Sequence, residues 1–270
     1  MRRLIANDPQ QEARAQGVLL DRLETSFAER VEAELISAMT RLVGEFGATG
    51  STPFHSIDHM RRMQQLYLDL AVISIDAFGG RVLDQGKALG LVLETKGFAE
   101  LFQRLAEEYV QAEEIRQRIT GVTETTRNII IRRIAMGQEA GLGVDQIARE
   151  ISEDIPDISR FRAHVIARTE THSAANYGAN GAAKATGLKM SKEWISVEDH
   201  RTRNFGDGDE YDHRAMNGQT VPMDMPFKMP WFGGDPISVM FPGDPAAPIG
   251  ATIMCRCGVA HIVDEESIFD

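Results

Sequence analysis

Cysteine is nearly absent from this chain of 270 residues, which contains only Cys255 and Cys257. Neighbours separated by one residue are poorly placed to bond to each other, and one such pair cannot hold a fold of this length together. We therefore expect two reduced thiols. Proline is scarce before residue 190, whereas seven of the ten prolines and both tryptophans follow it. Composition thus separates a long N-terminal part from a C-terminal part of different character.

The chain also lacks a long uninterrupted apolar run. Its most apolar segment, residues 66–78, contains Asp69 and Asp76, which a bilayer-spanning helix would not easily tolerate. At the N-terminus, the polar residues 7–9 precede any apolar stretch long enough for a secretion signal. We expect no membrane span, and a protein that is made and kept in the cytoplasm.

Positive charge is in short supply. The net charge is −11, and residues 191–270 hold six Lys and Arg against fourteen Asp and Glu. A free-standing binder of duplex DNA is usually basic, so such binding is not expected of the isolated chain. The acidic C-terminal part favours contact with protein surfaces or with cations. The sequence also has no glycine-rich phosphate loop, nucleophile elbow or HExxH motif.

Helical periodicity fills residues 10–187. Apolar residues recur at steps of three and four, the spacing of one helical face. The expected helices are residues 20–46, ended by Gly47 and Gly50; 57–78, ended by Gly79 and Gly80; 98–119, ended by Gly121; one that starts between Thr123 and Thr126; 145–154, closed by Pro156; and 158–185. The second half of the last helix is rich in Ala and Gly, which predicts close approach of another backbone.

Beyond Gly187, short apolar runs alternate with Pro and Gly turns. We predict a mainly α fold in which an elongated N-terminal helical body precedes a small α+β C-terminal domain. The predicted parts are an amphipathic helical region (1–120), the helical part of a second module (121–190) and a compact α+β domain (191–270).

Four residues of types that bind zinc fall in the C-terminal part, namely Asp199, His213, Cys255 and Cys257, with His261 as a substitute. Four such ligands could close a tetrahedral site. The CxC spacing is less typical of zinc than paired CxxC motifs. We favour buried reduced cysteines and a histidine bonded into a turn, and so expect no cofactor, with zinc as the alternative.

Several other motifs are interpreted as architectural. Asp199 with Arg201 and Arg203 suggests a structural ion pair, with a catalytic acid and substrate-binding arginines as the alternative. Arg168 and Glu170, in mid-helix, are expected to form an inward charged pair that docks this helix on the C-terminal part. A role in ADP-ribosyl transfer would need a strand framework instead.

Two segments are typical of turns. Asn217 and Gly218 both tolerate a positive φ, so residues 213–219 are expected to end in a hairpin turn. Residues 241–245, Phe-Pro-Gly-Asp-Pro, indicate a rigid turn rather than a site.

Taken in order, these motifs resemble the phage Mu protein F-like family of head morphogenesis proteins, the minor head proteins of tailed phages and prophages. The resemblance covers roughly residues 120–262 and rests on Ala167-Arg168-Thr169-Glu170, Lys192-Glu193-Trp194, Asp199-His200-Arg201-Thr202-Arg203, His213 with Asn217-Gly218-Gln219, Pro242-Gly243-Asp244-Pro245 and Cys255-Arg256-Cys257. Some family members carry cysteines where this chain has Arg203 and His213.

The resemblance implies a virion protein of the head, without established catalytic residues, that associates with the portal vertex and supports head assembly and genome packaging or ejection. Its implied partners are the portal protein and the major capsid protein. It also implies multimers at the portal vertex, and leaves contact with packaged DNA open. Within it, residues 121–190 are the helical part of the head morphogenesis module. We expect the helical body to anchor on the portal or inner shell.

Two other functions compete with this interpretation. A divergent metal-dependent hydrolase or toxin-related enzyme could use the four zinc-ligand candidates, but no spare general base accompanies a ligand motif, although Glu198 and Asp212 are nearby in sequence. A DNA-ejection protein that enters the host is the third reading. We expect a structural protein rather than an enzyme.

Overall fold

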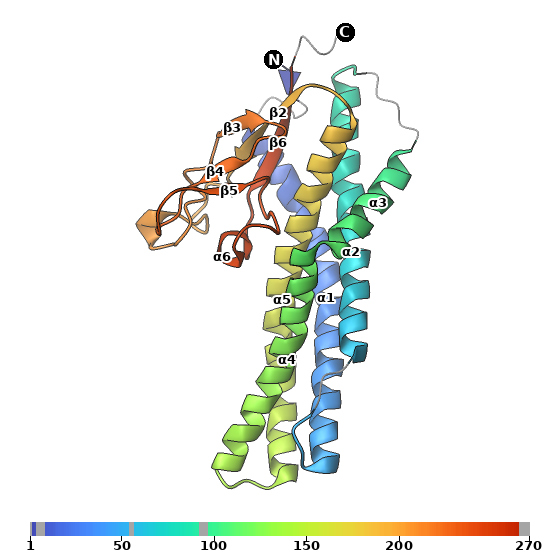
Figure 1. Ribbon diagram of the computed structural model, residues 1–270, viewed down its shortest axis with the longest axis vertical. Helices are drawn as coiled ribbons and strands as arrows, with labels where there is room; N and C mark the ends of the chain where they lie inside the picture. The colour runs from blue at the N-terminus through green and yellow to red at the C-terminus, as the bar shows by residue number, and fades with distance from the viewer. Residues whose placement is uncertain (1, 4–8, 54–56, 92–96, 265–270) are drawn as a thin grey trace. The chain divides into compact units, whose positions relative to one another are not determined.

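The computed structural model describes residues 2–3, 9–53, 57–91 and 97–264 (Figure 1). Its helices are α1 (Pro9–Thr49), α2 (Ile57–Ala88), α3 (Phe98–Gln111), α4 (Glu113–Glu139), α5 (Val144–Ala185) and α6 (Ile249–Thr252), with a 3-10 helix η1 at Phe205–Asp207. Its strands are β1 (Arg2–Arg3), β2 (Met190–Ile195), β3 (Thr220–Pro222), β4 (Phe227–Met229), β5 (Ile237–Val239) and β6 (Gly258–Val263). The predicted mainly α fold with a small α+β C-terminal part is confirmed. None of the described helices combines the length and apolar composition that a membrane crossing requires.

The chain divides into two compact units, each assembled from separate segments. Unit 1 contains Met1–Leu23, Leu70–Tyr109 and Arg168–Asp270, and unit 2 contains Glu24–Asp69 and Val110–Ala167. Helices α1, α2 and α5 therefore each contribute residues to both units. The predicted domain boundaries after residues 120 and 190 stay a prediction.

Unit 2 has an aliphatic core supplied by α1, α4 and α5. The end of the predicted apolar stripe of α1, with Met39, Leu42 and Phe46, is buried there. The core consists of Met39, Leu42, Val43, Phe46, Ile130, Ile134, Ile147, Ile151 and Ile155. The expected interruption at Pro156 is wrong, because α5 continues through it as one helix. A proline costs a helix interior about 3 kcal/mol, and burial of Ile151 and Ile155 on the same helix offsets that cost.

The expected end of the second helix at Gly79 and Gly80 is also wrong, since α2 runs on to Ala88. A side chain at Gly79 would place its Cβ 2.6 Å from Cε1 of Phe102. This glycine therefore permits close packing of α3 on α2 within unit 1, and does not end the helix.

The helix expected over residues 98–119 is two helices, α3 and α4, separated at Ala112. The backbone of Ala112 is extended, with φ −58° and ψ 139°. Gly121 lies inside α4, and the expected helix start at Thr123 to Thr126 is wrong. Both hydroxyls instead donate to carbonyls of the preceding turn, from Thr123 to Thr120 at 2.8 Å and from Thr126 to Val122 at 2.7 Å. Acidic residues in the first turn of α4, which complement the helix dipole, mark the true start.

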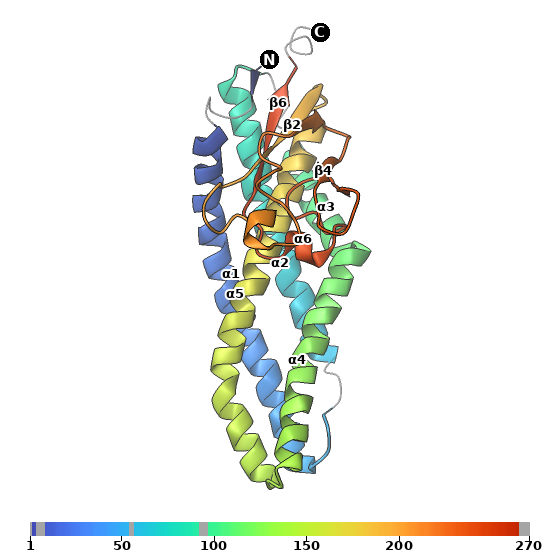
Figure 2. The same ribbon diagram turned by 90° about the vertical axis from the view of Figure 1, so that its left-hand side faces the viewer.

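Unit 1 contains a four-stranded sheet in the order β1-β6-β2-β3 and a separate β4-β5 pair among its described residues. Strands β2 and β6 are antiparallel, with Trp194 opposite Val259. The last turns of α5 pack closely in the same unit, because a Cβ at Gly178 would lie 2.6 Å from Cα of Ile75. The predicted close backbone approach is thereby confirmed. In Figures 1 and 2, β2 and β6 lie beside this C-terminal half of α5.

Candidate metal centre

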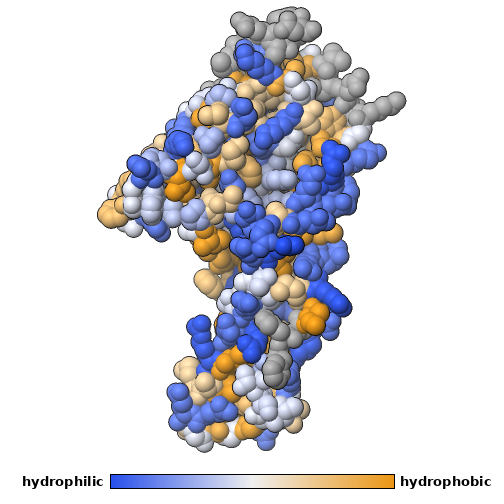
Figure 3. Space-filling model, in the orientation of Figure 1, coloured by the Kyte–Doolittle hydropathy of each residue, from blue (hydrophilic) through white to orange (hydrophobic). Residues whose placement is uncertain are grey.

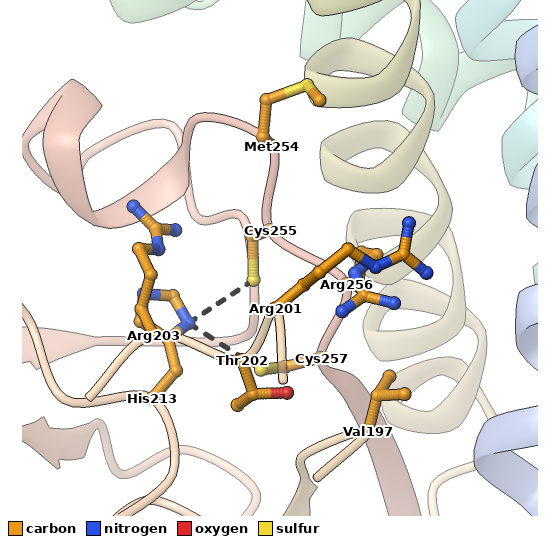
Figure 4. Close-up of a pocket in the computed structure, with 9 residues that line it drawn as sticks. All are labelled: Val197, Arg201, Thr202, Arg203, His213, Met254, Cys255, Arg256 and Cys257. Carbon is orange, nitrogen blue, oxygen red and sulfur yellow. Dashed lines mark hydrogen bonds between the residues drawn. The ribbon is translucent and has the colours of Figure 1, made fainter. Parts of the chain in front are cut away.

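Three of the four predicted zinc ligands come together in unit 1. Nδ1 of His213 lies 3.5 Å from Sγ of Cys255 and 3.5 Å from Sγ of Cys257 (Figure 4). The three ligand atoms all lie within 4.8 Å of one another, and each residue is 2–3% exposed. Nε2 of His213 has no hydrogen-bond partner in the described part of the chain. The two sulfurs are therefore the polar neighbours that orient this ring.

The fourth candidate, Asp199, is engaged elsewhere. Its Oδ2 accepts a hydrogen bond from Arg256 at 2.7 Å, its Oδ1 accepts a second bond from the same guanidinium, and the backbone N–H of Arg201 donates to Oδ1 at 2.9 Å. The bonds from Arg256 are the main reason that the pKa of Asp199 lies well below its usual range. The predicted pairing of Asp199 with Arg201 is present at 3.5 Å, but Arg256 is the stronger partner.

The two thiols differ in their readiness to ionise. Burial raises the pKa of Cys255, but the neighbouring Cys257 thiol and the charges of His172 and His213 outweigh burial and hold it well below its usual value. The Cys255 thiol, together with burial, raises the pKa of Cys257 well above its usual value. Thiolate is the form of cysteine that binds metals, so the lowered pKa of Cys255 favours metal binding.

The backbone around each ligand is fixed by other residues of the site. The backbone N–H of His213 donates to the carbonyl of Arg203 at 3.0 Å, and Oγ of Ser196 donates to the carbonyl of His213 at 2.5 Å. Arg203 in turn donates to the carbonyls of Gly250 and Ala251 in α6. Arg203 therefore links the segment that contains His213 to helix α6, which precedes the two cysteines.

Helix α5 supports the cysteine segment through one polar face. Oγ1 of Thr169 accepts from the backbone N–H of Met254 at 3.1 Å, and Nε2 of His172 donates to the carbonyl of Cys257 at 2.5 Å. Oγ of Ser173 donates to the carbonyl of Gly243 at 2.6 Å. Sequence reasoning missed His172 and Ser173. Residues three and four apart share a helix face, and His172 and Ser173 follow Thr169 at that spacing. The sequence therefore contained a pattern that could have predicted their common role.

The other motif residues have defined places. Trp194 is fully buried, and its ring lies edge-on to that of His213 at 6.2 Å between centroids. Gly218 has a positive φ of 77°, and Oδ1 of Asn217 accepts from the backbone N–H of Ser196, so the predicted turn is present.

His261, the substitute ligand, lies outside the group of three. It stands opposite Lys192 in the sheet, and burial lowers its pKa to about 4. On α5, Glu170 is buried, and Arg168 borders a cavity of about 600 Å³ in unit 1. The expected charged pair of Arg168 with Glu170 stays a prediction.

Comparison with known proteins gave one informative result. The model of a family described as phage Mu protein F like protein matches residues 128–260. No curated protein and no solved structure matched the chain. The matched range runs from within α4 to β6, and so includes the three-residue group together with the helix that supports it. Over these residues the chain belongs to the phage Mu protein F-like family, which indicates a head morphogenesis protein of the phage virion.

Proposed function

We propose that the protein is a structural, non-catalytic minor head protein of a tailed phage or prophage, which joins the procapsid at the portal vertex and supports genome packaging or ejection. The family match over residues 128–260 carries this proposal. It spans parts of both units, from α4 through all of α5 to β6. The partners that we propose are the portal protein and the major capsid protein.

The surface of unit 2 offers anchors for such partners. Phe161 on α5 is 72% exposed, and Met136 on α4 is 63% exposed. Aromatic side chains and methionine are enriched in protein interfaces, where a few buried anchors supply most of the binding free energy. Figure 3 shows hydrophobic patches among hydrophilic ones over the lower parts of the helices. We assign the docking contact to this helical surface.

The chemistry near the cysteines favours a structural role over hydrolysis. A metal-dependent hydrolase needs a group that can take a proton from water beside the metal. The described residues that line the cavity beside the cysteines include no carboxylate, and Asp199 is bound by Arg256. A minor head protein needs a rigid module there and no such base.

Incorporation into procapsids tests the proposal. The chain is co-expressed with its cognate capsid proteins, with and without the portal protein, and the particles are separated by density-gradient sedimentation. We expect the chain to sediment with portal-containing particles and to remain at the top of the gradient when the portal protein is omitted. A chain that stays free in both cases contradicts the proposal.

Two matched surface variants locate the contact. Phe161→Ser removes the exposed aromatic side chain of unit 2 and is expected to reduce incorporation about tenfold or more, as loss of an anchor residue does. Phe232→Ser removes a phenylalanine of unit 1 that is 84% exposed, and is expected to leave incorporation unchanged. The reverse result would move the docking contact to the C-terminal unit.

A further inference from the structure

The arrangement of His213, Cys255 and Cys257 matches the geometry of a zinc site. Zinc lies about 2.3 Å from sulfur and about 2.0–2.1 Å from nitrogen, so tetrahedral angles place a ligand nitrogen about 3.6 Å from a ligand sulfur. Nδ1 of His213 lies 3.5 Å from each of the two sulfurs. Both nitrogen–sulfur distances therefore suit a single ion that contacts all three atoms. We propose that these three residues bind a single Zn²⁺ in unit 1.

The backbone presents both sulfurs to the same point. In an extended segment, residues two apart face the same side, and Cys255 and Cys257 are such a pair at the entry to β6. Met254 immediately before them has a φ of 54°, a left-handed conformation that L residues rarely adopt. The backbone N–H of Met254 is held there by Thr169 on α5. This turn directs the CxC segment toward His213.

The charges of the site suit a divalent cation. Two thiolates balance the charge of Zn²⁺, so the loaded site is neutral and compatible with Arg201 and Arg203 at the rim. A cavity of about 20 Å³ adjoins the three ligands, which is enough for about one water molecule. Water at this position would complete the tetrahedron. Asp199 is not required, because its carboxylate is bound by Arg256 and Arg201.

Such an ion would link two segments of unit 1 that are far apart in the sequence. His213 follows η1, whereas the cysteines follow α6, so the metal would close the loop of residues 213–255. Because the ligands lie on both segments, metal binding would contribute free energy to the folding of unit 1. This inference does not depend on the proposed association with the portal.

Metal content of the purified full-length chain tests the proposal directly. We expect inductively coupled plasma mass spectrometry to give one zinc per chain after purification without chelator. We also expect the chelated chain to bind added Co²⁺ with the absorption bands of tetrahedral thiolate coordination. This spectrum requires no mutation and reports the sulfur ligands themselves. A wild-type chain that holds no zinc and gives no such spectrum overturns the proposal.

Variants identify the ligands. Cys255→Ser, Cys257→Ser and His213→Asn are each expected to lower zinc content about tenfold or more. Asp199→Asn, and His200→Asn at an exposed histidine, are expected to retain it. Circular dichroism confirms that each variant keeps its helices, and Co²⁺ titration of the wild type decides the question where a variant does not fold. Loss of zinc in Asp199→Asn but not in His213→Asn would overturn the assignment of these three ligands.

Discussion

The carboxylate of Asp199 joins two segments of the C-terminal part through its bonds to Arg256 and to the backbone of Arg201. Charge-assisted bonds of this kind are about twice as strong as neutral ones. We expect Asp199→Asn to lower the free energy of unfolding by about 2 kcal/mol at pH 7. Arg201→Ala is the matched control, with an expected loss of about 0.5 kcal/mol, because the Arg201 side chain is exposed.

The same pair has a defined pH dependence. The pKa of Asp199 is lowered in the folded state, so its contribution to stability is fully present above the unfolded-state pKa of about 3.9. That contribution is lost as the pH falls from there toward the folded-state pKa. Urea denaturation of wild type and Asp199→Asn between pH 7 and pH 3 measures the difference. A difference that grows on acidification would contradict this account.

At this scale the sequence predicted three of the residues that the structure brings together in the candidate metal centre, but not the role of the fourth. His213, Cys255 and Cys257 come together as expected, whereas Asp199 pairs with Arg256. Arg256 lies between the two cysteines in sequence, and its direction depends on the extended backbone of that segment. The spacing of residues in the sequence cannot show whether an aspartate pairs with a nearby arginine or binds a metal together with other ligands.

Among the helices, replacement of Gly178 in α5 by alanine has a predictable effect on stability. A methyl group at Gly178 would lie 2.6 Å from the backbone of Ile75, which cannot move aside as the end of a side chain can. Gly178→Ala is expected to lower the free energy of unfolding by about 1–3 kcal/mol. Gly80→Ala, in α2 with nothing within 4 Å of the new methyl group, is expected to raise it by about 0.5–1 kcal/mol.

Thermal or urea unfolding measures both variants, and their opposite signs are the test. Two substitutions of the same chemistry should differ only in what surrounds the added methyl group. Equal effects at Gly178 and Gly80 would mean that helix propensity alone governs these positions, and that α5 does not approach α2 closely at Gly178.

Helix existence was predictable from the sequence, but helix ends were not. The apolar stripe of α1 follows the spacing of three and four, and its residues from Phe27 to Phe46 are buried as expected. Gly79 and Pro156 were interpreted as ends because both residues weaken helices. Gly79 lies inside α2 because the missing side chain leaves room for Phe102. Helix α5 continues through Pro156 because burial of isoleucines in the core of unit 2 outweighs the cost of the proline. Such long-range packing has no signature in a local window of sequence.

For the whole molecule, the family match supports a function in phage head morphogenesis. The structural role that we propose in the phage head would account for helices with exposed apolar residues and for a C-terminal part with an acidic charge balance. Acidic surfaces steer association with basic partner surfaces and are sensitive to salt. The sequence predicted this family from motifs spread over residues 120–262, and the matched range of 128–260 agrees with it closely.

Association with the portal is the central claim, and native mass spectrometry of the chain mixed with its cognate portal ring tests it most directly. The account predicts ring masses increased by whole numbers of chains. The proposed zinc site is judged separately in the same spectra, as the mass of one zinc per chain that disappears on chelation. Spectra that contain only the unmodified ring and the free chain, at concentrations where procapsids assemble, would contradict the account.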